Sequence, residues 1–149
     1  MKNVLVSLCL LGARCRYDGR SKPATLSVPE DWHLVPVCPE QLGGLPTPRV
    51  PAEIRGARVV TQDGRDVTAE YYRGAEEALK IAEIFHCDTA ILKENSPSCG
   101  CGGVYDGSFT KTLISGDGIT ASLLKAHGIR VLGESKISTQ GTEADRKTR

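Results

Sequence analysis

The sequence predicts an α/β fold, in which a single domain is built on a mainly parallel sheet with crossover helices and long loops. Short apolar runs rich in β-branched residues are typical of strands buried on both faces of a parallel sheet. In the second half of the chain a helical pattern precedes such a run twice, which is the order of crossover helices and parallel strands. The 16 glycines and eight prolines of this 149-residue chain indicate extensive loops, and long organised loops commonly carry function.

Two buried strands are predicted in the first part of the chain. The runs NVLVSL at 3–8 and HLVPV at 33–37 are short and almost wholly apolar, and a cysteine follows each of them. The stretch between them is rich in turn formers and charge, so we expect a loop with at most one helical turn. Two very short strands are expected within residues 57–68, where Asp63-Gly64 is a hairpin signal.

A long amphipathic helix and three further elements follow. From residue 68 to residue 85, apolar side chains recur every three or four positions, which is the stripe that a helix buries against a sheet. The stripe consists of Tyr72, Ala75, Leu79, Ala82 and Phe85. The run DTAILK at 88–93 predicts a third buried strand, ITASLLKAH at 119–127 a short helix that stops at Gly128, and IRVLGE at 129–134 a fourth strand.

The predicted domain spans residues 1–134. The remaining stretch, 135–149, is polar and shows neither the helical nor the strand period. We therefore expect it to form a frayed or disordered C-terminal tail.

Charge and hydropathy exclude several classes of function. A formal net charge of +1, with 25% charged residues, gives no electrostatic reason to bind bulk nucleic acid or a membrane. No apolar run approaches the roughly 18 residues that a membrane span needs, and the apolar N-terminal run lacks the small-residue cleavage site of a signal peptide. We expect a cytoplasmic protein whose six cysteines stay reduced, which favours thiol chemistry or metal binding over disulfides.

Three of the cysteines follow predicted strands. Cys9 and Cys38 follow the first two, and Cys99 lies a short loop beyond the third. Because the carboxyl ends of parallel strands share one edge of the sheet, where ligands bind, we expect these thiols to meet. Zinc, an iron–sulfur cluster and ordinary reduced cysteines are all open at this point. The close C-x-x-C pairs common in zinc sites are missing, whereas three thiolates on a cubane would leave one iron open.

Five motifs occur in order between about Val4 and Glu134: SLCLLGARCRYDG, VCPEQLGGLPTPR, ILKENSPSCG, VYDGSF and GDGITASLL. Together they resemble the thiouracil desulfidase family. The resemblance implies a Rossmann-like α/β domain with a [4Fe-4S] cluster on three cysteines and the fourth iron open. It also implies a small-molecule substrate, a thiolated pyrimidine such as 2-thiouracil or a 4-thiouracil base or nucleotide. Its thiocarbonyl sulfur would be replaced by oxygen from water and released as sulfide, without net redox change.

Matched motif by motif, the resemblance implies Cys9, Cys38 and Cys99 as the cluster ligands. It implies Glu40, two residues beyond Cys38, as the acid/base, and Ser96, three residues before Cys99, as a hydrogen-bonding or proton-relay partner. A soft thiocarbonyl sulfur suits iron in a sulfur-rich cluster, and its binding there would expose the ring carbon to water. Without the resemblance, Glu40 would be interpreted as a helix cap and Ser96 as a residue that closes a turn.

The remaining candidates carry weaker signals. Lys93, Arg49 and the backbone of Gly102 and Gly103 are candidates for binding a substrate phosphate or carbonyl oxygen, although such residues are more commonly solvated. Cys15, six residues from Cys9, is a candidate resolving thiol or alternative ligand. Cys101 departs from the family motif and is interpreted as incidental. Four residues show no ligand spacing and are expected to pack or to lie at the surface, namely Cys87, His33, His86 and His127.

Two functions of other classes stay open on the sequence. The first is a zinc-binding or cluster-binding sensor module without turnover, which would lose nothing when Glu40 is replaced. The second is a sulfur carrier in which Cys99 or Cys101 forms a persulfide, and such a protein would be colourless and tolerant of oxygen.

Overall fold

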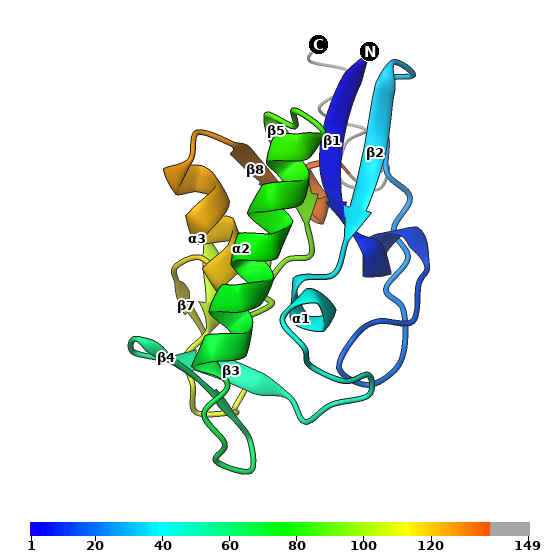
Figure 1. The fold of residues 1–149 in the computed structure, drawn as a ribbon. Coiled ribbons are helices and arrows are strands. Elements are labelled where there is room, and N and C mark those ends of the chain that lie inside the picture. Colours follow the sequence, from blue (N-terminus) through cyan, green and yellow to red (C-terminus); the bar gives the residue numbers. More distant parts are fainter. Residues whose placement is uncertain (138–149) are drawn as a thin grey trace.

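Four parallel strands form the central sheet of the computed structural model, which describes residues 1–137 (Figure 1). In spatial order they are β2 (Trp32–Val37), β1 (Lys2–Ser7), β5 (Thr89–Leu92) and β8 (Arg130–Gly133). All three neighbouring pairs run parallel. The structure confirms the predicted α/β class and each of the four predicted strands.

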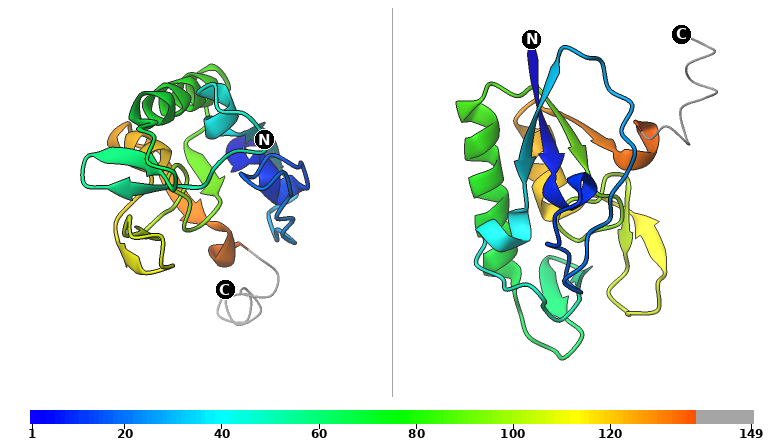
Figure 2. Two further views of the ribbon diagram at one scale, coloured as in Figure 1. Left: turned by 90° about the horizontal axis from the view of Figure 1, so that it is seen from below. Right: turned by 90° about the vertical axis from the view of Figure 1, so that its right-hand side faces the viewer.

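The sheet is buried on both faces because its central strands are mainly apolar. Val4, Leu5 and Val6 of β1 are inaccessible to solvent, and all of β5 is buried. Helices α2 (Thr68–Ile84) and α3 (Ile119–Ala126) cover one face (Figure 2). The other face is covered by the 3-10 helix η1 (Leu8–Leu11), the long segment between β1 and β2, and Ile137.

The first residues of the predicted tail belong to the folded domain. Glu134–Lys136 forms the 3-10 helix η2, and Ile137 is buried in the cluster that contains Val4 and Val6. The Ser27 amide donates a hydrogen bond to the Ile137 carbonyl at 2.8 Å, which ties this segment to the loop after η1. The rest of the predicted tail, 138–149, lies outside the described residues.

Helix α2 is present as predicted, but its buried face is rotated relative to the predicted stripe. Tyr72 and Phe85 are 48% and 44% exposed. The buried residues are Tyr71, Gly74, Ala75, Ala78 and Ala82. A close contact with the short helix α1 (Pro39–Leu42) sets this rotation, because only glycines bring the two backbones together: a Cβ on Gly74 would overlap the Pro39 carbonyl.

Two hairpins extend beyond the sheet, and neither was placed correctly from the sequence. The first joins β3 (Ala52–Arg55) to β4 (Arg58–Thr61) through Gly56-Ala57, not through Asp63-Gly64 as predicted. Asp63-Gly64 forms a turn that closes only an isolated bridge between Val60 and Asp66. The second hairpin, β6 (Gly103–Tyr105) with β7 (Leu113–Ser115), has strands of three residues, which are too short to show an alternating pattern.

The chain connections bring three strand ends to one edge of the sheet. Helix α2 precedes β5 and helix α3 precedes β8, as crossover connections, whereas β1 reaches β2 through η1 and a long loop. Because β2, β1 and β5 are neighbours and parallel, their carboxyl ends lie side by side. Within residues 1–137, no helix is long and apolar enough to cross a membrane.

The contact between α1 and α2 predicts a large effect of one methyl group. Alanine is the better helix former by about 1 kcal/mol, yet we expect Gly74→Ala to lower the free energy of unfolding by about 2 kcal/mol, because overlap with the Pro39 carbonyl forces the helices apart. Urea unfolding measures the change. Glu76→Ala, on the exposed side of α2, is the matched control and should shift stability by less than about 0.5 kcal/mol. A Gly74→Ala variant as stable as the parent would contradict this packing.

Candidate active site

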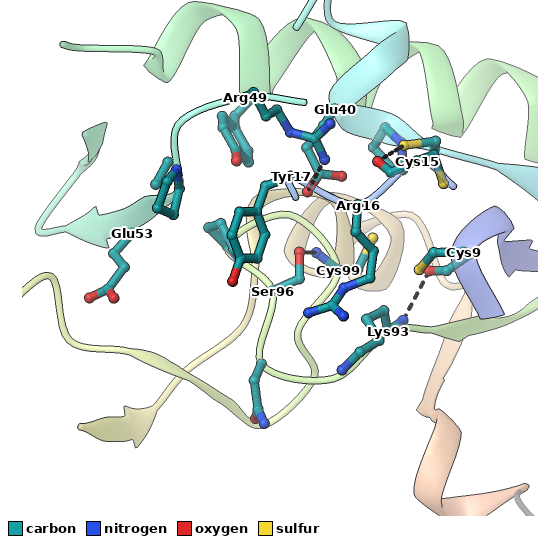
Figure 3. A pocket seen from close by; sticks show the side chains of 18 of the residues that line it. Cys9, Cys15, Arg16, Tyr17, Glu40, Arg49, Glu53, Lys93, Ser96 and Cys99 are labelled. Atoms are coloured by element: carbon teal, nitrogen blue, oxygen red, sulfur yellow. Dashed lines mark hydrogen bonds and ion pairs between the residues drawn. The ribbon is translucent and has the colours of Figure 1, made fainter. Parts of the chain in front are cut away.

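A cavity of about 390 Å³ opens where β1, β2 and β5 end (Figure 3). Cys9, Cys38 and Cys99 all line it. The three cysteines come from segments far apart in the sequence, and the structure brings them together as their positions after parallel strands predict. Cys15 lines the same cavity and is 4% exposed.

The positions of Cys9 and Cys38 follow from the way their strands end. Cys9 lies in η1, directly after β1, and the left-handed Gly12 (φ 104°) turns the chain away after that helix. Cys38 occupies the N-cap position of α1, and its carbonyl accepts a hydrogen bond from the Leu42 amide at 3.0 Å. Since α1 packs closely on α2 through glycines, the backbone of Cys38 is fixed against the longest helix.

The Cys99 loop is held by its own serines and by the first turn of α3. Ser96 Oγ accepts hydrogen bonds from the amides of Ser98 and Cys99, both at 3.1 Å. The Ile119 amide donates to the Pro97 carbonyl at 2.9 Å, and the hydroxyls of Ser98 and Thr120 form a buried hydrogen bond of 2.7 Å. The loop is therefore an ordered wall of the cavity in spite of its glycines.

Burial keeps the cavity thiols protonated. Removal from water raises the pKa of Cys9 to about 11 and that of Cys38 to about 12, and it raises the pKa of Cys99 well above its usual value. The negative charge of Glu40, which lines the same cavity, is the next largest cause of the raised pKa for all three thiols. Cys38 also donates a weak hydrogen bond to the Cys15 carbonyl, with 3.8 Å between sulfur and oxygen. Among the described residues, no three His, Cys, Asp or Glu side chains are arranged to hold a single metal ion.

Glu40 forms an ion pair with Arg49 beside the thiols (Figure 3). Glu40 Oε2 lies 3.6 Å from a guanidinium nitrogen, and the two side chains are only 13% and 8% exposed. Arg49 also donates to the Pro46 carbonyl at 3.2 Å and to Thr47 Oγ1 at 3.1 Å. The guanidinium is thus fixed by the loop after α1, and it compensates a carboxylate that would otherwise be buried unpaired.

The other predicted binding residues divide into two groups. Lys93 lines the cavity, and its ammonium pairs with Glu134 at 3.2 Å and donates to the Glu94 carbonyl at 2.9 Å. Gly102 and Gly103 do not line it: the Gly102 amide donates to Asp117 Oδ1 at 2.8 Å, and Gly103 begins β6. The structure does not bring these two glycines to the thiols.

The two remaining cysteines lie outside the cavity. Cys101 packs against the core on the α3 side, and its thiol donates to the Val131 carbonyl at 3.5 Å. Cys87 is buried in the same core cluster. The placement of Cys87 agrees with the packing or surface role expected from the sequence, and Cys101 also packs against the core.

Several cavity residues were not predicted. Arg16 and Tyr17 follow Cys15 in the sequence, and their side chains extend into the cavity, with the guanidinium 5.7 Å from the centre of the tyrosine ring (Figure 3). Their position directly after Cys15, a candidate ligand, was the sequence signal that could have identified them as site residues. Four others come from elements remote in sequence, namely Glu53, Tyr71, Phe109 and Lys111. Glu53 was missed because the first hairpin was predicted at the wrong turn. Phe109 and Lys111 were missed because the second hairpin was not predicted.

The comparisons with known proteins agree with this geometry. A family model described as 2-thiouracil desulfurase matches residues 4–136, which is most of the chain. The chain belongs to the 2-thiouracil desulfurase family. This identifies it as an enzyme of the thiouracil desulfurase kind, as the sequence motifs predict.

Two relatives are similar to this desulfurase over most or all of its length. A solved structure of a [4Fe-4S]-dependent thiouracil desulfidase, TudS, is 41% identical, with a TM-score of 0.84 and full coverage of both chains. An uncharacterised protein of Bacillus subtilis, YbbK, is 43% identical over 91% of this chain and 97% of its own length. The TM-score over the full length of both chains supports the overall fold described for this desulfurase.

The ion pair beside the thiols of this desulfurase predicts that substitutions of Glu40 and Arg49 have non-additive effects on the free energy of unfolding. We expect Arg49→Met to lower the free energy of unfolding by about 3 kcal/mol, because it leaves the Glu40 carboxylate buried without a partner. Glu40→Gln with Arg49→Met should cost at least about 1 kcal/mol less than the sum of the single changes. Urea unfolding of the parent, the two single variants and the double variant completes this double-mutant cycle. Additive costs would show that the two side chains do not interact.

Proposed function

We propose that this desulfurase holds a [4Fe-4S] cluster on Cys9, Cys38 and Cys99, leaves one iron without a protein ligand, and removes sulfur from a thiolated pyrimidine. Water supplies an oxygen atom and two protons, and the products are the oxo-pyrimidine and hydrogen sulfide, with no net redox change. The observation that carries the proposal is the convergence of three thiols, from three strand ends, on one cavity.

The donor set fits a cluster better than a single zinc ion. Zinc with thiolates at about 2.3 Å would require sulfurs within roughly 4 Å of one another, and no described side chains have that arrangement. A cubane separates its ligands by the width of the cluster, so thiols around a cavity suit it. The [4Fe-4S] dependence of the TudS neighbour supports the same cofactor.

Glu40 is the proposed acid/base. The cluster, when bound, supplies a Lewis-acidic iron that polarises the thiocarbonyl. Glu40 Oε2, held at 3.6 Å from the Arg49 guanidinium, then takes a proton from the attacking water and returns it to the departing sulfur. The ion pair with Arg49 keeps the carboxyl group in place for both transfers.

Ser96 is the proposed hydrogen-bond donor to the substrate. Its oxygen already accepts from two amides, but a hydroxyl retains one hydrogen to donate. Because Ser96 lines the cavity in the same loop as Cys99, that hydrogen is available to a carbonyl oxygen or ring nitrogen of the pyrimidine. The structural role in the turn and the proposed role toward substrate are therefore compatible.

The outer part of the cavity suits a planar base with or without an anionic group. Its volume of about 390 Å³ lies within the usual range for small-molecule sites. Tyr17 offers an aromatic face, and Arg16, Lys93 and Lys111 offer positive charge. We propose a thiolated pyrimidine base or its nucleotide as substrate, and a reducing cytoplasm as the setting, because six free cysteines are maintained there.

Iron content tests the ligand set. After anaerobic purification and reconstitution, we expect about four irons per chain and sulfide release from 2-thiouracil or 4-thiouridine monophosphate. Cys9→Ala, Cys38→Ala and Cys99→Ala should each lower both values, because each removes a ligand. The matched controls Cys87→Ala and Cys101→Ala, outside the cavity, should retain the iron. A colourless iron-free chain that still transfers sulfur would favour the persulfide carrier.

Glu40→Gln separates turnover from binding. We expect the variant to keep its iron and to release sulfide about 100-fold more slowly, the usual range for loss of an acid/base group. Glu76→Gln, on the exposed side of α2, is the control. A parent protein that binds iron but releases no sulfide, or a Glu40→Gln variant of undiminished rate, would contradict the mechanism and favour a binding module.

A further inference from the structure

One wall of the cavity is a loop that contains none of the thiols. The segment 106–112 connects β6 to β7, and it brings Phe109 and Lys111 to the cavity. Most of its hydrogen bonds are internal and exposed, such as that from the Ser108 amide to Asp106 Oδ1 at 2.9 Å. These contacts shape the turn but do not fix it relative to the cysteines.

A buried carboxylate from another hairpin fixes this loop. Glu53 of β3 is 8% exposed, and its Oε1 accepts hydrogen bonds from the amides of Gly107 at 2.9 Å and Phe109 at 3.1 Å. From the same strand, Arg55 Nη2 donates to the Gly107 carbonyl at 2.7 Å. A buried carboxylate is costly unless it is hydrogen-bonded, so the two amides and Glu53 stabilise each other.

The loop has a backbone that needs such support. Phe109 and Lys111, the two residues that reach the cavity, have positive φ values of 59° and 60°, which side chains other than glycine rarely adopt. Gly107 (φ 94°) passes so close to β3 that a Cβ would lie 2.9 Å from the Ile54 carbonyl oxygen. Strained positions of this kind persist where the surroundings hold them, and they concentrate at binding sites.

We propose that Glu53 is a positioning residue for substrate binding, which holds the 106–112 loop so that the Phe109 ring packs on the planar face of the pyrimidine. Lys111 is then held at the outer part of the same cavity, where it would meet an anionic substituent. The inference rests on the proposed function, since it assumes that a thiolated pyrimidine occupies this cavity. Glu53 acts through the loop and takes no part in the chemistry at the thiols.

The test compares Glu53→Ala, Glu53→Gln and Phe109→Ala in the reconstituted full-length enzyme. We expect Glu53→Ala to raise KM for 4-thiouridine monophosphate at least about tenfold, because the loop loses both hydrogen bonds to the carboxylate, with little change in kcat. Glu53→Gln should rescue most of this loss, because its amide oxygen still accepts from both amides. Phe109→Ala should raise KM similarly. Glu76→Ala is the surface control.

Hydrogen exchange provides a second readout that does not depend on turnover. In Glu53→Ala we expect faster exchange of the Gly107 and Phe109 amides, whereas Phe109→Ala should leave the Gly107 amide protected. If Glu53→Ala does not fold, Arg55→Ala removes the other anchor of the loop and should raise KM in the same direction. Binding of uridine monophosphate by calorimetry tests the inference even if no chain releases sulfide, a result that would overturn only the proposed reaction.

Three results would overturn the inference. One is faster amide exchange in Glu53→Ala with unchanged KM and unchanged calorimetric affinity, since the loop would then be structural only. Another is a rise in KM that is as large in Glu53→Gln as in Glu53→Ala while the Gly107 and Phe109 amides stay protected, since Glu53 would then contact the substrate directly. The third is an unchanged KM in Phe109→Ala.

Discussion

The site depends on the parallel pairing of β1 with both β2 and β5. This order places the ends of three sequence-distant strands next to one another, and each end leads into a short segment that carries a cysteine. The glycine contact between α1 and α2 fixes the second of these segments, and the hydrogen bonds between the Ser96–Gly100 loop and α3 fix the third. The thiols therefore lie on rigid elements, as a preorganised metal centre requires.

Two glutamates at the cavity have different partners and hence different roles. Glu40 pairs with the Arg49 guanidinium at 3.6 Å and adds negative potential to all three thiols. Glu53 is occupied by backbone amides and so supports a loop. On this account Glu40 is the carboxylate that moves protons beside the thiols, and Glu53 takes no part in that chemistry.

The sequence was sufficient for the sheet and the thiols, because both depend on local patterns. Buried parallel strands are continuous apolar runs, and a residue placed after such a run must lie at the carboxyl edge. The rotation of α2 could not be predicted, since the backbone contact of Gly74 with Pro39 overrides the apolar stripe. Phe109, Lys111 and Glu53 were missed because they reach the cavity through hairpins with strands of three or four residues. Glu40 and Ser96 came from family motifs, and no local pattern would have distinguished them from a cap and a turn.

The central claim is that Cys9, Cys38 and Cys99 together hold the metal centre. The most direct measurement is an anomalous difference map at the iron absorption edge from crystals grown and frozen without oxygen. The account predicts about four iron peaks within the cavity, with one of these cysteines next to each of three peaks and no cysteine next to the fourth. A single peak, a fourth iron bound by Cys15, or iron outside the cavity would contradict it.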